Sequence, residues 1–176
     1  MELNALLGQP VALPSLPRTV ALLMNELAQR EPSLRRLNLL FGSDPVLAAR
    51  LLELANAPAH QLTRQVAGIS EALVLLGSAP LQTLVSSATL GTAARAVQGI
   101  NLQQFWRYSL RVAEISKSLA GVLRQNQGNA FTAGLIHAIG ILVMHIAMPD
   151  AVAPLDMATP PFDLTRGAAE KAAFGY

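Results

Sequence analysis

The chain has no cysteine among its 176 residues. A disulfide framework, a zinc site built from thiolates and a catalytic cysteine are therefore all excluded. A chain without cysteine is compatible with a reducing compartment. Residues 1–4 also lack the basic and long apolar segments that open a secretory signal. We therefore expect a cytoplasmic protein.

Charged residues are scarce, at 14% of the chain, and 13 basic against 11 acidic side chains give a formal net charge of +2. Two basic clusters stand out, the adjacent pair Arg35 and Arg36 and the pair Arg107 and Arg111, which lie one helical turn apart. Only eight residues are aromatic, so stacking surfaces for bases are few. We expect these arginines to lie on a solvated face, and nucleic-acid binding through them is the weakest functional hypothesis.

Acidic residues are absent from residues 115–149, a very apolar segment that contains His137 and His145. Divalent cations in proteins are held by several histidine, carboxylate or thiolate ligands that converge within about 2.0–2.6 Å. On one continuous helix, eight residues would separate the two histidines by about 12 Å along the axis. His60 is distant in sequence, where we expect an ordinary loop residue. The segment alone therefore predicts no metal site.

Motifs for nucleophilic or phosphate chemistry are missing as well. The chain contains no G-x-S-x-G, no G-x-x-x-x-G-K-[ST] and no G-x-G-x-x-G sequence. Its carboxylates are too scattered to suggest a general acid and base. Asp44 precedes Pro45 and is better explained as a helix cap.

Hydrophobic residues make up 52% of the chain, and the mean hydropathy is +0.38. The longest apolar run, residues 135–148, is shorter than the roughly 20 residues that span a bilayer. It predicts a buried core helix and no membrane insertion. High hydropathy with few charges also predicts an exposed apolar surface, which marks either a partner surface or missing pieces of the fold.

Apolar residues recur at spacings of three and four almost throughout, which predicts an all-α fold. Proline, glycine and capping residues then set the helix boundaries. The expected helices are about 16–30, 34–42, 45–56, 71–76, 81–97, 102–124, 130–148 and 164–174, with a short segment at 2–7 before them. Leu119 and Leu123 are expected on the buried side of helix 102–124, and residues 154–161 are expected to form a loop.

Five segments follow one another in a specific order. They are Leu13-Pro-Ser-Leu-Pro17, Ser43-Asp-Pro-Val-Leu-Ala-Ala-Arg-Leu-Leu-Glu-Leu-Ala-Asn56, Ile69-Ser-Glu-Ala-Leu-Val-Leu-Leu-Gly77, Phe105-Trp-Arg-Tyr-Ser-Leu-Arg-Val-Ala113 and Phe131-Thr-Ala-Gly-Leu-Ile-His-Ala-Ile-Gly140. Together they resemble the HDOD domain, a bacterial family of non-catalytic relatives of the HD and HD-GYP metal-dependent phosphohydrolases. The resemblance covers about residues 11–176.

The resemblance implies a compact HD-like bundle of about eight to nine helices in one domain with two lobes. We place the N-terminal lobe at about 11–97 and the HD-like lobe at about 101–176, with residues 97–101 as the boundary. Relatives normally continue after a Phe-Gly segment like Phe174-Gly175 into a further histidine-containing helical stretch. The domain is therefore expected to be truncated at its C-terminus.

The same comparison bears on the metal site of the catalytic relatives, where a histidine on one helix and a His-Asp pair on the next help to hold the metals. The matching positions here are Tyr108 and the pair His137-Ala138. A phenol replaces imidazole poorly, and alanine has no ligand atom. We expect no catalytic residue, no cofactor and no bound metal, with His137 as a remnant hydrogen-bonded inside a packed pocket.

Two functional hypotheses follow. The leading one is a non-catalytic bacterial signal-transduction or regulatory module that docks a protein partner, or its own missing C-terminal part, onto apolar helix faces. The alternative is a degenerate phosphohydrolase that still binds a nucleotide or cyclic dinucleotide, or retains weak turnover. The candidate pocket or interaction residues are Leu13, Pro14, Leu16, Pro17, Trp106, Arg107 and Arg111, the last three near Tyr108 and His137.

Overall fold

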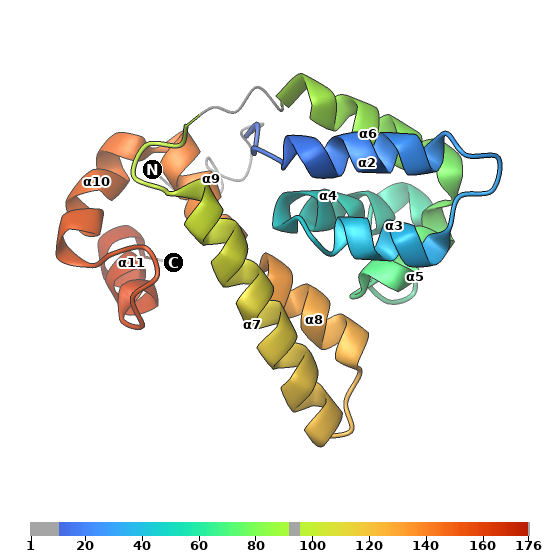
Figure 1. The fold of residues 1–176 in the computed structure, drawn as a ribbon. Helices are drawn as coiled ribbons and strands as arrows, with labels where there is room; N and C mark the ends of the chain where they lie inside the picture. The colour runs from blue at the N-terminus through green and yellow to red at the C-terminus, as the bar shows by residue number, and fades with distance from the viewer. Residues whose placement is uncertain (1–10, 92–95, 176) are drawn as a thin grey trace. The chain divides into compact units, whose positions relative to one another are not determined.

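The fold was obtained as a computed structural model that describes residues 11–91 and 96–175 (Figure 1). The predicted all-α fold class is confirmed, since these residues form helices, a short 3-10 helix and an isolated β-bridge, and no strand. The short segment predicted at residues 2–7 lies outside the described residues. Contacts divide the chain into two units, which we call the α2–α8 unit (14–95 and 103–139) and the α9–α11 unit (1–13, 96–102 and 140–176).

This division differs from the two predicted lobes. The segment 103–139 belongs with the N-terminal helices, because its second helix packs on α4 and α5. A boundary at residues 97–101 assumes that each lobe is continuous in sequence. In the division by contacts, each unit instead consists of two or three separate segments of the chain.

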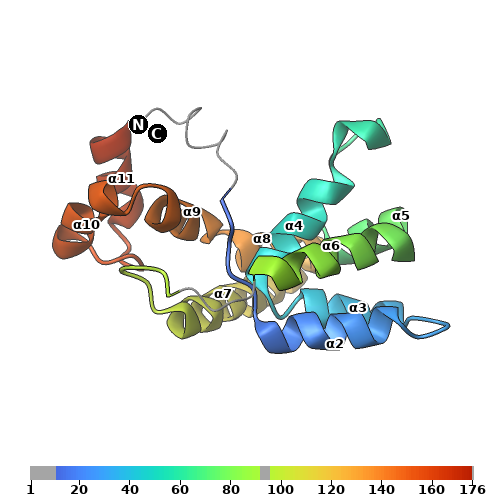
Figure 2. The same ribbon diagram turned by 90° about the horizontal axis from the view of Figure 1, so that it is seen from above.

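The α2–α8 unit holds most of the helices. Their bounds are α2 Pro17–Leu27, α3 Leu34–Phe41, α4 Pro45–Ala55, the 3-10 helix Pro58–His60, α5 Ile69–Leu76, α6 Ser78–Gly91, α7 Leu102–Val122 and α8 Gln127–Ile136. Seen from above, α2 and α3 run side by side, and α6 packs along α2 (Figure 2). Their apolar faces meet in one core, in which Phe41, Leu47, Leu51 and Leu73 are almost completely buried.

Capping residues begin α3 and α4 as the sequence predicts. The Ser33 hydroxyl accepts the N–H of Arg36. The Asp44 carboxylate accepts the N–H groups of Val46 and Leu47, and Pro45 fills the first helical position. These contacts satisfy donors that a helix N-terminus otherwise leaves free.

Helices α7 and α8 form a hairpin whose two axes approach closely at Gly134. A Cβ added there would lie 2.7 Å from the Ser116 hydroxyl and 2.9 Å from the Ala113 Cα. Only glycine permits this approach without a shift. The Thr132 hydroxyl also accepts the N–H of Ile69, which ties α8 to the start of α5.

The buried face of α7 differs from the prediction. Its buried residues are Phe105, Ser109, Ala113 and Ala120. The prediction that Leu119 and Leu123 are buried is wrong, because both side chains are more than half exposed. Small residues, rather than the leucines, face α8 because the two helices lie so close together.

The α9–α11 unit contains α9 Ile139–Ala147, α10 Pro149–Ala158 and α11 Arg166–Phe174, with a turn closed by a bridge between Val97 and Ile100. Helices α10 and α11 pack together (Figure 1). The apolar cluster of this unit is small, with Met144, Met148 and Val152 buried.

Three expected boundaries in this region are wrong. The single helix 130–148 is broken between α8 and α9 at His137 and Ala138. The expected loop 154–161 is largely helix α10, which begins at Pro149 and contains Pro154. A proline inside a helix costs one backbone hydrogen bond, but Pro149 at the first turn costs none. The last helix starts at Arg166, since Asp163 accepts the N–H of Thr165 in a turn before it.

One continuous stretch in the described part of the chain, residues 127–147, has the length and composition of a membrane span; residues 69–76 and 78–88 pass the same test only if they are taken as one span despite a bend of 113°. Buried core helices of soluble proteins pass the same test, so this is weak evidence for a span. The stretch is interrupted at residues 137–138, and Leu135 and Leu142 are fully buried. The absence of membrane insertion stays a prediction.

Candidate functional site

The structure brings Tyr108 of α7 and His137 at the end of α8 together. Their ring centroids are 5.3 Å apart and the ring planes are tilted by 48°. Ala138 follows and is buried. The three residues expected at the degenerate site therefore lie on two neighbouring elements of the α2–α8 unit.

His137 is exposed, which corrects the expectation that it lies inside a packed pocket. Its Nδ1 lies 2.7 Å from the carbonyl oxygen of Gly134, so the predicted hydrogen bond is present. The ring is accessible because α8 ends there and the chain turns before α9 begins. In the described ranges, no three His, Asp or Glu side chains converge as metal ligands would.

The Leu13-to-Pro17 segment has a structural role that its sequence did not predict. The N–H of Leu16 donates to Oδ2 of Asp44 at 2.6 Å, and Pro17 starts α2. Pro14 is buried, whereas Pro17 is exposed. The segment therefore docks the start of α2 onto the cap of α4, and its role in partner binding stays a prediction.

Asp44 is completely buried and uses both carboxylate oxygens. Oδ1 accepts from Val46 at 2.9 Å and Leu47 at 3.2 Å, and Oδ2 accepts from Leu16. Burial raises the pKa of the Asp44 carboxyl above its ordinary value of 3.8, while these three N–H groups and the charge of Arg50 lower it.

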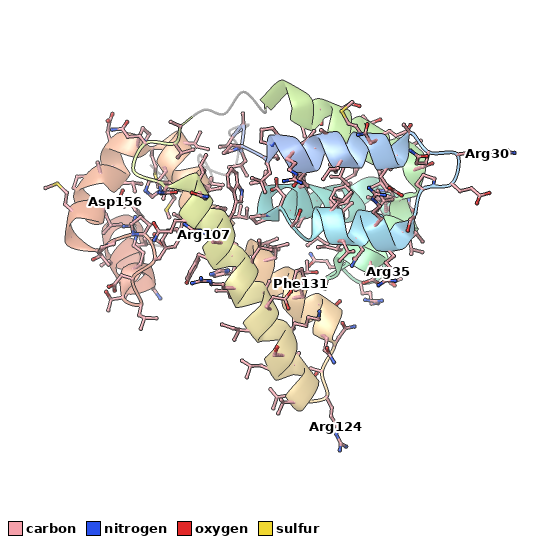
Figure 3. The ribbon with its side chains drawn as sticks, viewed as in Figure 1. Arg30, Arg35, Arg107, Arg124, Phe131 and Asp156 are labelled. Atoms are coloured by element: carbon pink, nitrogen blue, oxygen red, sulfur yellow. The ribbon has the colours of Figure 1, made fainter. Side chains whose placement is uncertain are left out.

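Trp106, Arg107 and Arg111 lie on α7. The indole N–H of Trp106 is buried, and no acceptor for it lies among the described residues. Arg107 and Arg111 are both exposed. Arg36 of the other basic cluster forms an ion pair with Glu26 at 3.1 Å. Figure 3 shows Arg35 and Arg107 on separate parts of the α2–α8 unit, so the two clusters form no continuous basic stripe.

A buried polar cluster in the α9–α11 unit was missed by the sequence analysis. His145 is buried; its Nε2 lies 2.9 Å from Oδ2 of Asp156, and its Nδ1 lies 2.7 Å from the carbonyl oxygen of Ile141. Arg166, also buried, donates to Oδ1 of Asp156 and to Glu170, each at 2.7 Å. Both ring nitrogens of His145 therefore face an oxygen acceptor, and a neutral imidazole carries an N–H group on only one of its two nitrogens.

The one sequence hint of this cluster was the pair Arg166 and Glu170, spaced four apart on a helix. His145 and Asp156 are separated by eleven residues, so their contact depends on how α9 and α10 fold together. Gly99 packs against both, since a Cβ there would lie 3.0 Å from Oδ2 of Asp156 and 3.1 Å from the His145 ring. Its positive φ of 81° also favours glycine.

A cavity of about 610 Å³ opens in the α2–α8 unit beside the start of α8. Its lining includes Arg64, Glu71, Glu114, Lys117 and Phe131, with Asn129 beside them. Arg64 and Glu71 form an ion pair, and the Lys117 ammonium lies 5.9 Å from the centroid of the Phe131 ring. His137 and Tyr108 are not part of its lining.

Comparison with known proteins gives a family and several similar structures. The family model of the HDOD domain matches residues 13–176. The MmoQ response regulator from Methylococcus capsulatus strain Bath is 25% identical with a TM-score of 0.75, and the match covers 93% of this chain and 66% of that one. A virulence factor from Campylobacter jejuni subsp. jejuni shares the fold at 21% identity and a TM-score of 0.66, covering 96% of this chain and 60% of that one. The chain spans less than two thirds of the length of these proteins, and no curated protein matches it.

Proposed function

Because the chain belongs to the HDOD domain family, we propose that it is a non-catalytic regulatory module that acts by binding another protein in bacterial signal transduction or gene regulation. The family and the similarity to a response regulator support a regulatory or HD-related role.

The observation that carries the non-catalytic assignment is the chemistry around His137. Its neighbours at the positions of the relatives' ligands are a phenol and a methyl group, and the described residues contribute no convergent carboxylates. A lone exposed imidazole can bind a transition metal only weakly, because structural and catalytic sites use three or four protein ligands. Without a metal to activate water, the HD-type hydrolytic reaction has no nucleophile.

Metal analysis of the purified protein, together with a phosphodiesterase assay in manganese or iron, tests this assignment. We expect less than stoichiometric metal and no turnover above background in the wild type and in His137→Ala. His60→Ala is the matched control, since His60 is also exposed. A stoichiometric metal lost in His137→Ala but kept in His60→Ala would show that the site is a working metal centre.

The nucleotide-binding alternative is favoured by the cavity beside α8. A volume of about 610 Å³ is within the range of small-molecule sites, and the lining combines an aromatic ring with a lysine. Calorimetric titration with a cyclic dinucleotide tests it, with Lys117→Ala expected to weaken binding at this site. Binding that survives Lys117→Ala would place the nucleotide elsewhere, and no heat at all would remove this alternative.

A further inference from the structure

Helix α7 carries a row of exposed apolar side chains, which we call the α7 stripe. It consists of Ile115, Leu119, Val122 and Leu123, which are 60%, 57%, 81% and 68% exposed. Leu119, Val122 and Leu123 follow Ile115 by four, seven and eight residues, which places all four on one face of the helix. Single exposed leucines are ordinary, but a stripe at this spacing is the pattern by which a helix packs on another element.

The stripe is free because α8 covers a different face of α7. Gly134 brings α8 against Ala113 and Ser116, and the buried residues of α7 are Phe105, Ser109, Ala113 and Ala120. The hairpin is therefore held together without the stripe. Larger side chains on the stripe contribute nothing to the described core, so their apolar character needs another explanation.

The charge of the hairpin is unlike that of the rest of the chain. Residues 103–139 contain four basic side chains and one acidic one, a net charge of +3 with histidine neutral, although the whole chain carries +2. Arg111 lies one turn before Ile115 and Arg107 two turns before it, and both are exposed. Figure 3 shows Arg107 and Arg124 toward opposite ends of α7. Of these cations, Arg111 and Arg107 continue the stripe toward the N-terminal end of α7, whereas Lys117 lies on the opposite side of the helix and Arg124 follows its C-terminal end. The stripe therefore has a basic edge of two exposed arginines at its N-terminal end.

We propose that the α7 stripe docks an amphipathic helix of a partner protein whose polar edge is acidic. This proposal rests on the proposed function and names the surface and the chemistry of the partner. The stripe spans about 12 Å from Ile115 to Leu123, and about 24 Å separate Arg107 from Leu123, so a partner helix of about five turns would reach both the stripe and the arginines. Leucine or isoleucine side chains at matching spacing would cover it, and Asp or Glu at the partner's edge would face Arg107 and Arg111.

Two other occupants fit the observations less well. Helices that lie on anionic membranes present a wide apolar face with Trp or Phe and many Lys or Arg, whereas this stripe has four aliphatic residues and few flanking cations. Nucleic acids are held chiefly through phosphates and stacked bases, and the stripe offers neither aromatic rings nor a row of cations. An amphipathic helix with an acidic edge would contact both the α7 stripe and the two arginines, Arg107 and Arg111.

Fluorescence anisotropy with the whole chain tests the proposal. The probe is a labelled peptide of about 18 residues with leucines at helical spacing and glutamates on one edge, and the comparison probe is a scrambled peptide of the same composition. We expect the helical probe to bind at least tenfold more tightly than the scrambled one. Leu119→Ser combined with Leu123→Ser should weaken it at least tenfold, and Arg111→Glu should weaken it and reduce its dependence on salt.

Val74→Ser is the matched control, because Val74 is 71% exposed on α5 and should leave binding unchanged. The proposal fails if the two peptides bind equally, or if the double variant binds like the wild type. It also fails if phosphatidylglycerol vesicles or duplex DNA bind more tightly than the helical probe. A wild-type dimer that the double variant converts to a monomer would assign the stripe to a second copy instead.

Failure here is separable from failure of the proposed function. Metal-dependent turnover would overturn the non-catalytic assignment without changing these binding curves. Equal loss of peptide binding in the double variant and in Val74→Ser would show that the loss is not specific to the stripe, and would overturn this proposal while leaving the non-catalytic assignment untouched.

Discussion

The interiors of the two units are built from different side chains. In the α2–α8 unit, the core is a continuous cluster of mostly aliphatic residues that includes the fully buried Phe41, and most of its helices contribute to it. In the α9–α11 unit, three buried apolar residues form a small cluster, and a buried network of His145, Asp156 and Arg166 lies alongside.

The difference teaches how each unit should respond to substitution. Apolar burial is non-directional and contributes roughly in proportion to area, so an aliphatic core loses stability gradually. A buried ionic network depends on every member, because a partner left alone is a buried charge without an acceptor or donor. The following substitutions test this contrast, from the largest expected effect to the smallest.

Asp156→Ala should have the largest effect. It leaves both His145 and Arg166 buried without their shared acceptor, and we expect a loss of about 3–5 kcal/mol. Amide hydrogen exchange should accelerate across α9, α10 and α11 and stay slow in α2–α6. Asp150→Ala, an exposed position on the same helix, is the control and should cost less than about 1 kcal/mol. Equal protection in both variants would show that the network is not what holds this unit.

Leu51→Ala should have the next largest effect, about 3 kcal/mol, because Leu51 is fully buried in the aliphatic core. Urea unfolding of the α2–α8 unit should shift to lower concentration without loss of cooperativity. Leu39→Ala removes an exposed leucine of α3 and should change stability by less than about 0.5 kcal/mol. Similar shifts for the two variants would contradict the assignment of this core.

Asp44→Asn tests a buried carboxylate whose partners are backbone N–H groups rather than cations. The amide turns one acceptor into a donor that faces an N–H group, so we expect a loss of about 1–3 kcal/mol. A raised pKa means that the folded state keeps a proton which the unfolded state has released between pH 3.8 and the raised value. Wild-type stability then falls as pH rises through that window, and the variant lacks this slope.

The stability difference between wild type and Asp44→Asn should therefore narrow as pH rises from 3.8. Urea unfolding of both proteins at a series of pH values measures it. A difference that widens with pH would show that the three N–H donors outweigh burial and lower the pKa of Asp44.

Gly134→Ala should have the smallest effect. Alanine favours the helix by about 1 kcal/mol, but its Cβ would meet the backbone of α7 at 2.9 Å, and overpacking costs about 1–3 kcal/mol. We expect a net loss of about 1 kcal/mol in thermal unfolding. Gly140→Ala is the control, since nothing lies within 4 Å of its added Cβ, and it should be neutral or stabilising. Stabilisation by both variants would mean that α7 and α8 separate easily.

Local features of this HDOD protein were predictable because they depend on neighbours in sequence. The caps at Ser33 and Asp44 need only the residues that follow them, and both are confirmed. Features that depend on a second element were not. Leu119 and Leu123 fit a buried face by spacing, but the close approach of α8 selected a face of small residues instead.

The candidate site was predictable in part. The motifs place Tyr108 and His137 at positions that match metal ligands of the catalytic HD relatives, and the structure brings their rings together. The exposure of His137 was not predictable, because the apolar run gave no sign of a break at residues 137–138. The cavity beside α8 was also missed, since it joins residues from α3, α5, α7 and α8.

The sequence by itself determined the all-α class, the family and the capped starts of α3 and α4, since periodicity, caps and ordered motifs are properties of neighbouring residues. Tertiary structure alone decided which face of α7 is covered and which polar groups meet in the α9–α11 unit. The physical reason is that packing and buried ionic contacts depend on the distance between helices, and the contact between His145 and Asp156 exists only when α9 and α10 fold against each other.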